Sequence, residues 1–213
     1  MENTYVEYQY HTGEATHDDG YLWEKVNELL IRNVPPPRKI FEIGCGNGFS
    51  AYRLRNVGYE VTGIDPSKSG IEHGRRTYPE IPLFEGSAYD DLLEKYGQFP
   101  VVLSLEVIEH LYDPRTFVRR VYELLEPGGT GIISTPYHGY WKNLTLALLG
   151  RFDQHFSPLW DSGHIKFFSE ATLSRLLSEA GFEKLRIYRV GRISALAKSM
   201  VAVFRKPGRP TGK

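Results

Sequence analysis

Two kinds of hydrophobic pattern alternate along the chain. Short apolar runs are typical of buried strands, and the segments between them repeat apolar residues at the three-to-four spacing of a helix face. Strands alternating with helices predict an α/β fold with an open, mostly parallel, seven-stranded sheet and helices on both faces. The expected strands are 39–43, 59–64, 83–84, 98–105, 131–134, 182–190 and 196–205, and the expected helices are 21–33, 49–57, 66–78, 113–125 and 169–181.

Proline and glycine divide the chain into three parts. Pro35, Pro36 and Pro37 end the first helix, so residues 1–36 form a tyrosine-rich N-terminal helical segment. The main domain is expected over residues 37–206, with an apolar insert at about 136–168 that interrupts the alternation of strands and helices. Residues 207–213 are polar and basic and are expected to be a disordered tail.

A glycine-rich turn connects the first strand to the helix that follows it. Gly44, Gly46 and Gly48 allow a tight turn and the close approach of a ligand to the main chain. The helix after the turn directs unpaired N–H groups toward this loop. Asp65 ends the second strand, where its carboxylate can accept hydrogen bonds from ribose hydroxyls. No lysine follows the glycines as in a triphosphate-binding loop, so the pattern argues against a bound triphosphate.

A second group of polar residues follows the fourth strand directly. Glu106, Glu109 and His110 are spaced i, i+3 and i+4, which predicts that one helical turn projects all three from the same side. Two converging carboxylates repel each other unless a cation lies between them, and carboxylates with an imidazole suit Mg²⁺, Mn²⁺ or a softer divalent ion. In the alternative interpretation Glu106 assists the cofactor, Glu109 is solvated and His110 caps or packs.

Composition limits the classes of function. The 213 residues fit one globular domain, and 26 basic residues balance 26 acidic ones, which argues against a DNA partner and disfavours RNA. The single Cys45 excludes an internal disulfide, suits a reducing cytoplasm and is expected to pack in the glycine loop. We found no secretory signal pattern and no apolar run long enough to span a bilayer, so a cytoplasmic location is expected.

The glycine loop resembles motif I of the class I S-adenosylmethionine (SAM) methyltransferases. A Leu-x-Pro-Gly-Gly sequence at 125–129 is similar to the same family, in which N-terminal segments serve as lids over the cofactor. Surface decoration is the alternative role for the tyrosines here. Ser87 stands where the family often has an acidic contact to adenine. The resemblance implies these SAM-binding residues: Glu42, Gly44, Cys45, Gly46, Asp65, Pro66, Ser87, Ala88, Leu105 and Glu106.

The sequence Glu106-Val-Ile-Glu109-His110 resembles that of the ubiquinone-pathway O-methyltransferases and of the plant small-RNA 2′-O-methyltransferases. The resemblance implies a divalent cation, Mg²⁺ or another, bound by Glu106, Glu109 and His110. A later histidine completes the set, and His164 is favoured over His138 and His155 because it precedes the last long helix. Glu109 and His110 would then be catalytic. Without a metal, His110 would act as general base.

The insert is rich in Trp and Leu. It predicts peripheral membrane contact through 140–160, a lid over the substrate, or a homodimer contact.

From these motifs together we predict a SAM-dependent O-methyltransferase that acts on a small hydroxylated aromatic or lipophilic molecule. One alternative is an RNA 2′-O-methyltransferase, which zero net charge disfavours. The other is a SAM-binding scaffold without activity, which would not need the acidic and histidine cluster.

Overall fold

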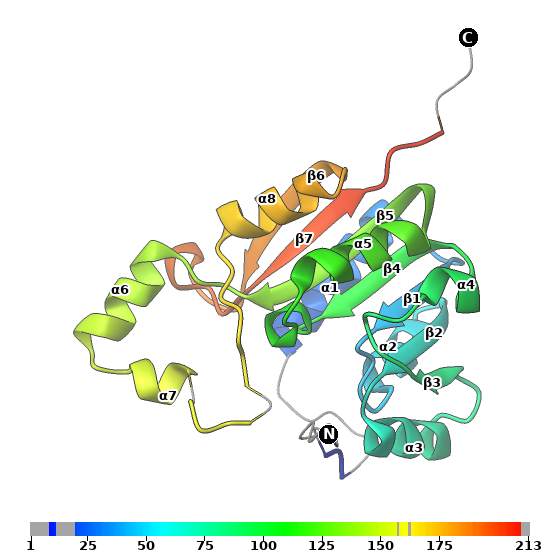
Figure 1. Cartoon of the computed structure of the whole chain (residues 1–213), viewed down its shortest axis with the longest axis horizontal. Coiled ribbons are helices and arrows are strands. Elements are labelled where there is room, and N and C mark those ends of the chain that lie inside the picture. Colours follow the sequence, from blue (N-terminus) through cyan, green and yellow to red (C-terminus); the bar gives the residue numbers. More distant parts are fainter. Residues whose placement is uncertain (1–8, 12–19, 157, 162, 210–213) are drawn as a thin grey trace.

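The computed structural model describes residues 9–11, 20–156, 158–161 and 163–209. Within them, the strands form one seven-stranded sheet in the order β3-β2-β1-β4-β5-β7-β6, which confirms the predicted fold class (Figure 1). Neighbouring strands from β3 to β5 are parallel, and β7 runs antiparallel to both β5 and β6. The strands are β1 Lys39–Ile43, β2 Glu60–Asp65, β3 Leu83–Glu85, β4 Phe99–Leu105, β5 Leu125–Pro136, β6 Glu183–Val190 and β7 Ser199–Arg205.

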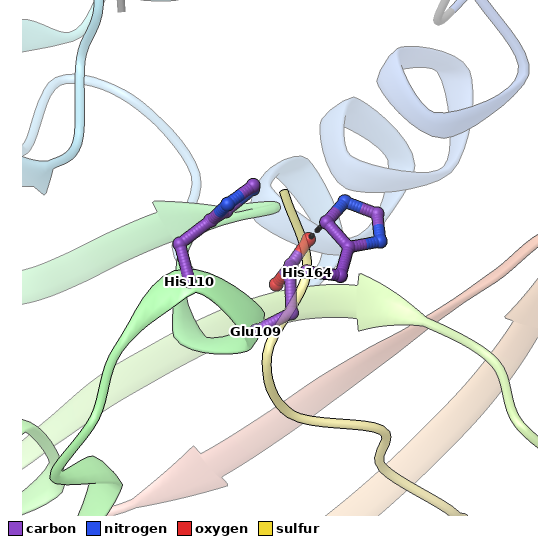
Figure 2. Close-up of side chains that lie close together, drawn as sticks. All are labelled: Glu109, His110 and His164. Carbon is purple, nitrogen blue, oxygen red and sulfur yellow. Dashed lines mark ion pairs between the residues drawn. The ribbon is translucent and has the colours of Figure 1, made fainter. Parts of the chain in front are cut away.

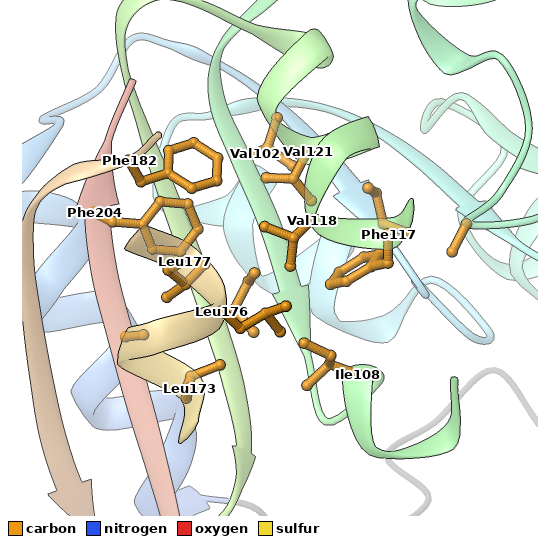
Figure 3. Close-up of a cluster of buried hydrophobic side chains, with 14 of the residues drawn as sticks. Val102, Ile108, Phe117, Val118, Val121, Leu173, Leu176, Leu177, Phe182 and Phe204 are labelled. Atoms are coloured by element: carbon orange, nitrogen blue, oxygen red, sulfur yellow. The ribbon is translucent and has the colours of Figure 1, made fainter. Parts of the chain in front are cut away.

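Helices cover both faces of this sheet. Buried apolar side chains of α1, α2 and α3 pack on one face. Those of α4, α5 and α8 pack on the other, where Phe117 and Leu173 belong to one hydrophobic cluster (Figure 3). The helices are α1 Gly20–Asn33, α2 Phe49–Asn56, α3 Lys68–Thr77, α4 Leu92–Tyr96, α5 Pro114–Leu124, α6 Tyr140–Leu148, α7 Phe152–Phe156 and α8 Glu170–Glu179. The helix α1 is therefore part of the core, and a lid role would fall on residues before it.

The strand order places the candidate residues at the carboxyl ends of neighbouring strands in the sheet. The strand β1 has β2 on one side and β4 on the other, so the direction in which the chain winds reverses between β1 and β4. Ligands of open α/β sheets bind at such a point, beyond the carboxyl ends of the strands. Gly44, Asp65 and Glu106 each lie at or directly after the carboxyl end of β1, β2 or β4.

The C-terminal part of the sheet differs from the prediction. The strand β5 begins at Leu125 and includes the Pro-Gly-Gly sequence that was expected to precede it. The N–H of Gly128 donates to the carbonyls of Lys206 and Pro207, and the N–H of Lys206 donates to Gly129. These bonds fix the first residue of the expected tail, of which residues 210–213 lie outside the described part. A 3₁₀ turn, Ser194–Leu196, replaces the expected start of the last strand, which begins at Ser199.

The insert forms two short helices, α6 and α7, which extend away from the sheet (Figure 1). The chain then returns toward α8 through residues 163–168, a segment without regular structure that we call the return segment. In the described part of the chain, no helix combines the length and the hydropathy that crossing a membrane requires.

Candidate active site

The glycine loop is fastened to the end of β2. The N–H groups of Gly44 and Cys45 donate to the carbonyl of Ile64 at 2.8 and 2.9 Å. The N–H of Gly46 donates to Asp65 Oδ2 at 2.8 Å. Gly44 and Gly46 have φ angles of 80° and 54°, which L side chains rarely adopt. The loop therefore has a fixed shape, and the backbone conformation explains the choice of glycine.

One described residue of the N-terminal segment lies on this loop. A Cβ added at Gly46 would lie only 2.5 Å from the hydroxyl of Tyr10. The N–H of Tyr10 donates to Ser69 Oγ at 3.1 Å, which ties it to α3. Tyr10 is thus placed where a lid residue would contact a bound ligand. Of the other residues in the predicted lid segment, 1–8 and 12–19 lie outside the described part of the chain, and the helix α1 packs in the core.

Two buried carboxylates lie next to the loop. Asp65 accepts from the N–H groups of Gly46 and Ser67, both at 2.8 Å. These two bonds fix the carboxylate at the carboxyl end of β2, beside the glycine loop. Glu42 is 1% exposed, and its Oε2 lacks a hydrogen-bond partner among the described residues. Burial raises the pKa of Glu42 to about 7, opposed by a hydrogen bond from Ser50 and assisted by the charge of Asp65.

The other residues expected to bind cofactor surround the same edge. Ser87 follows β3, and its N–H donates to Asp90 Oδ2 at 2.9 Å, which forms a tight turn with buried Ala88 beside it. Leu105 ends β4 and is half-buried, and Pro66 is exposed after β2. The structure therefore places all of these residues around the carboxyl ends of β1 to β4.

The prediction that Glu106 lies on the same helical turn as Glu109 and His110 is wrong. The φ of Glu106 is 52°, and this residue precedes the 3₁₀ turn η1, Ile108–His110, instead of lying on it. Its carboxylate accepts from the hydroxyl of Ser134 at 2.8 Å and from that of Ser199 at 3.2 Å. Because the backbone changes direction here, spacing along one helix did not predict which side chains meet. Glu106 is not a member of the group of metal-binding donors found in the structure.

Glu109, His110 and His164 form that group (Figure 2). One donor atom from each lies within 4.8 Å of the others. The His164 Nε2 is 4.0 Å from Glu109 Oε1, and His110 Nδ1 is 3.2 Å from the carbonyl of Gly163. The return segment positions His164, because the N–H groups of Ile165 and Lys166 both donate to the Glu109 carbonyl at 2.9 Å. The structure thus brings three of the four expected ligands together.

The electrostatics of this group suit a cation. Glu109 is fully buried, and both carboxylate oxygens lack a hydrogen-bond partner among the described residues. Burial raises the pKa of Glu109 well above its usual range, and the charge of Glu106 adds to the effect. Burial, followed by the charge of His110, lowers the pKa of His164 to about 4, so its imidazole is neutral and has a lone pair to offer. An orphaned carboxylate beside imidazoles fits a divalent ion.

A cavity of about 360 Å³ adjoins the group. Glu106 and His164 connect it to the residues described above, and His138 and His155, the other candidate histidines, line it without joining Glu109. Sequence reasoning missed several of the residues in its wall. Lys142 had one signal, because it is the only charged residue in the apolar stretch 137–150. The residues that line the cavity are Tyr21, Glu106, Pro136, His138, Lys142, Thr145, Leu146, His155, Phe156, His164, Arg192, Leu196, Lys198 and Ser199.

Comparison with known proteins bears on this arrangement. The family model described as "Methyltransferase domain" matches residues 15–187. A Mycolicibacterium smegmatis protein named "probable S-adenosylmethionine-dependent methyltransferase" is 33% identical over 81% of this chain and 65% of its own length. A ubiquinone biosynthesis O-methyltransferase of Thiobacillus denitrificans is 31% identical over 75% of this chain and 72% of its own.

A solved structure has the same fold. The magnesium protoporphyrin IX methyltransferase of Synechocystis, with S-adenosylhomocysteine (SAH) bound, superposes with a TM-score of 0.65 at 18% identity, over 86% of this chain and 81% of that one. The chain spans 58–65% of the length of three curated relatives that it matches. By the match to the family model and the class I topology of its sheet, the chain belongs to the family of SAM-dependent methyltransferase domains.

Proposed function

We propose that this protein transfers the methyl group of SAM to a hydroxyl oxygen of a small acceptor bound in the 360 Å³ cavity. The observation that carries the proposal is the group of buried Glu109 and half-buried His110 and His164, of which His164 lines that cavity. The name of the ubiquinone-pathway relative supports oxygen as the methylated atom. A cavity of this size supports a small molecule in preference to a nucleic acid strand.

The glycine loop and the carboxylates beside it fit SAM, which supplies an electrophilic methyl group when bound. Asp65 would accept hydrogen bonds from the ribose, because its position at the end of β2 is fixed by two backbone N–H groups. The orphaned Oε2 of Glu42 offers a negative partner close to the loop for a cationic ligand. Tyr10 lies over Gly46 and would limit the access of water from that side.

Glu109, His110 and His164 would hold a divalent cation, which lowers the pKa of a bound hydroxyl through its Lewis acidity. The chain prepares these ligands. The carbonyl of Gly163 accepts from His110 Nδ1 when that nitrogen is protonated, which leaves Nε2 with its lone pair. In the version without a metal, this Nε2 would take the proton of the acceptor hydroxyl as general base.

Calorimetric titration tests the two sites separately. SAH should bind to protein treated with EDTA, and Asp65→Ala should lose this binding. Mn²⁺, Zn²⁺ and Mg²⁺ are then titrated individually, and Glu109→Gln and His164→Ala should abolish the heat of whichever ion binds. His73→Ala is the matched control, because His73 lies on α3 outside the metal-binding group.

Each outcome has a clear meaning for the proposal. If SAH does not bind, the proposed methyl transfer is wrong. If SAH binds and no ion does, the metal-assisted version fails, and methyl transfer to catechols with a pH profile sensitive to His110→Ala would support the general-base version. If a metal binds equally well to Glu109→Gln, the assignment of its ligands is wrong.

A further inference from the structure

Cationic side chains gather on the cavity wall. Lys142, Arg192 and Lys198 all line it, and Glu106 is the one carboxylate among the described residues that do so. The hydroxyls of Ser134 and Ser199 already bind the Glu106 carboxylate. The cavity therefore carries an excess of positive charge, although the whole chain has a net charge of zero.

Lys142 is the most informative of these residues because it is buried. It is only 7% exposed, and its Nζ donates to the carbonyl of Lys198 at 3.2 Å. In the described part of the chain it has no ion pair with a carboxylate. Burial, followed by the charge of Arg192, lowers the pKa of Lys142 to about 8, and Glu106 opposes this. A buried, largely protonated lysine without an acidic partner is costly unless a ligand supplies the charge.

The rest of the wall contributes no compensating negative charge. Burial lowers the pKa of His138 to about 4 and also lowers that of His155, and the charge of Lys142 adds to both effects. Arg192 and Lys198 come from the segment that joins β6 to β7, whereas Lys142 comes from α6. Two separate parts of the chain thus place cations on the same cavity, next to the group that contains His164.

We propose that the acceptor carries an anionic group, a carboxylate or a phosphate monoester, which Lys142 and Arg192 bind at this wall. The inference rests on the proposed function, because it takes the cavity to be the acceptor site. The hydroxyl to be methylated would lie toward Glu109, and the anionic group toward α6 and the segment between β6 and β7. Charge-assisted hydrogen bonds from lysine and arginine are the usual means of holding such groups.

Three small aromatic probes test the binding of the anion without any turnover. Benzoate, phenyl phosphate and benzamide have similar size and shape, and only the first two are anionic. Each is titrated into protein with and without SAH, and binding is followed by ligand-observed NMR. We expect at least one anion to bind with a Kd about tenfold or more below that of benzamide. The better of benzoate and phenyl phosphate identifies the source of the negative charge.

Variants locate the bound anion. Arg192→Met and Lys142→Met should each remove most of the preference for the anion, and the control Arg119→Met should keep it, because Arg119 is exposed on α5 and does not line the cavity. Arg192 is exposed, so its replacement tests the inference even if Lys142→Met fails to fold. Equal binding of benzamide and the anions, no detectable binding of any probe, or a preference that survives Arg192→Met would overturn the inference.

A turnover experiment separates this inference from the proposed function. Transfer of labelled methyl from SAM is measured with 3,4-dihydroxybenzoate and with 3,4-dihydroxybenzamide. A higher kcat/KM for the benzoate, reduced by Arg192→Met through KM, supports both. Anion binding that depends on Arg192, together with SAH binding that fails, leaves the anion site standing and removes the methyl-transfer proposal. Methyl transfer with equal kcat/KM for the two acceptors leaves the methyl-transfer proposal standing and removes the anion site.

Discussion

At the scale of single residues, the surroundings of each carboxylate decide its role. Asp65 is held by backbone N–H groups and Glu106 by serine hydroxyls, whereas the two carboxylate oxygens of Glu109 have no hydrogen-bond partner among the described residues. An unpartnered buried carboxylate destabilises the folded chain unless it is protonated or meets a cation.

Glu42 allows the destabilising effect of a buried carboxylate to be measured. Its pKa of about 7 in the folded chain lies above the ordinary 4.5, so the folded chain binds this proton more tightly than the unfolded chain does. The contribution of this proton to the free energy of unfolding is complete below pH 4.5 and is lost as the pH rises through 7. In Glu42→Gln that loss is absent. We expect the variant to exceed the native chain in free energy of unfolding by up to about 3 kcal/mol at pH 8, and by much less at pH 5.

Urea unfolding at the two pH values checks this prediction in the absence of ligands. Glu126→Gln is the control, because Glu126 is an exposed glutamate at which the same substitution should change little. An equal effect of Glu42→Gln at pH 5 and pH 8 would show that Glu42 is ionised in the folded chain throughout this range.

Gly44 links the glycine loop to the proposed metal ligands. A Cβ at this position would overlap Cγ2 of Val107, the residue directly before η1. Gly44→Ala should destabilise the chain by about 1–3 kcal/mol through backbone strain and the forced shift of Val107. It should also weaken SAH binding, measured by calorimetry. Gly58→Ala is matched in strain, with a φ of 98°, but its new Cβ would contact only Pro36. If Gly58→Ala weakens SAH binding as much, the effect of Gly44 is not local.

At the scale of elements, the return segment and the insert have different tasks. The return segment is fixed to Glu109 by two hydrogen bonds and holds His164. The insert exposes large apolar side chains on α6 and after α7, among them Trp141 at 62%, Leu148 at 78% and Leu159 at 95%. Exposed tryptophan and leucine on short helices are typical of contact with a lipid surface. We therefore propose that the insert makes peripheral membrane contact.

Sedimentation with vesicles tests the role of the insert. The native chain should sediment with vesicles of phosphatidylcholine and phosphatidylglycerol, and the double variant Leu148→Ser, Leu149→Ser should bind about tenfold less, because it loses the burial of two leucines. Ile31→Ser on α1 removes an exposed apolar side chain elsewhere and should bind normally. If the native chain does not sediment, the exposed apolar side chains of the insert serve as a lid or a dimer contact. Gel filtration of the native and double-variant chains then distinguishes these two roles.

At the scale of the whole molecule, one sheet carries both halves of the site. The glycine loop follows β1 and Glu109 follows β4. The cationic side chains that line the cavity belong to segments that follow β5 and β6. Because all these strands pair side by side, we expect the domain to unfold as one cooperative unit. A ligand bound at one edge should then stabilise the whole.

SAH provides the measurement. At a concentration of about 100 times its Kd, it should add about 2.7 kcal/mol to the free energy of unfolding. For a domain of this size, that corresponds to a rise in Tm of roughly 5–10 °C in a single transition. Asp65→Ala should show no such rise at the same SAH concentration. Two separate transitions, of which SAH shifts only one, would contradict the single cooperative unit.

The sequence determined the elements and their order, because each depends on local signals. Glycines between an apolar strand and a helix predicted the loop, Asp113 with Pro114 and Ser169 predicted two helix starts, and the alternation predicted the sheet. His164 was favoured as a metal ligand from its place before the last long helix; the structure places it 4.0 Å from Glu109, and its binding of a metal stays a prediction.

Only the tertiary structure decided which side chains meet. The left-handed backbone at Glu106 removed it from the metal-binding group, which helical spacing had not anticipated. The charge of the cavity depends on Lys142, Arg192 and Lys198, which are up to 56 positions apart and come together because β7 pairs with β5 and β6. Local pattern fixes the conformation of a segment, whereas contact between distant segments depends on strand pairing and on backbone geometry at single turns.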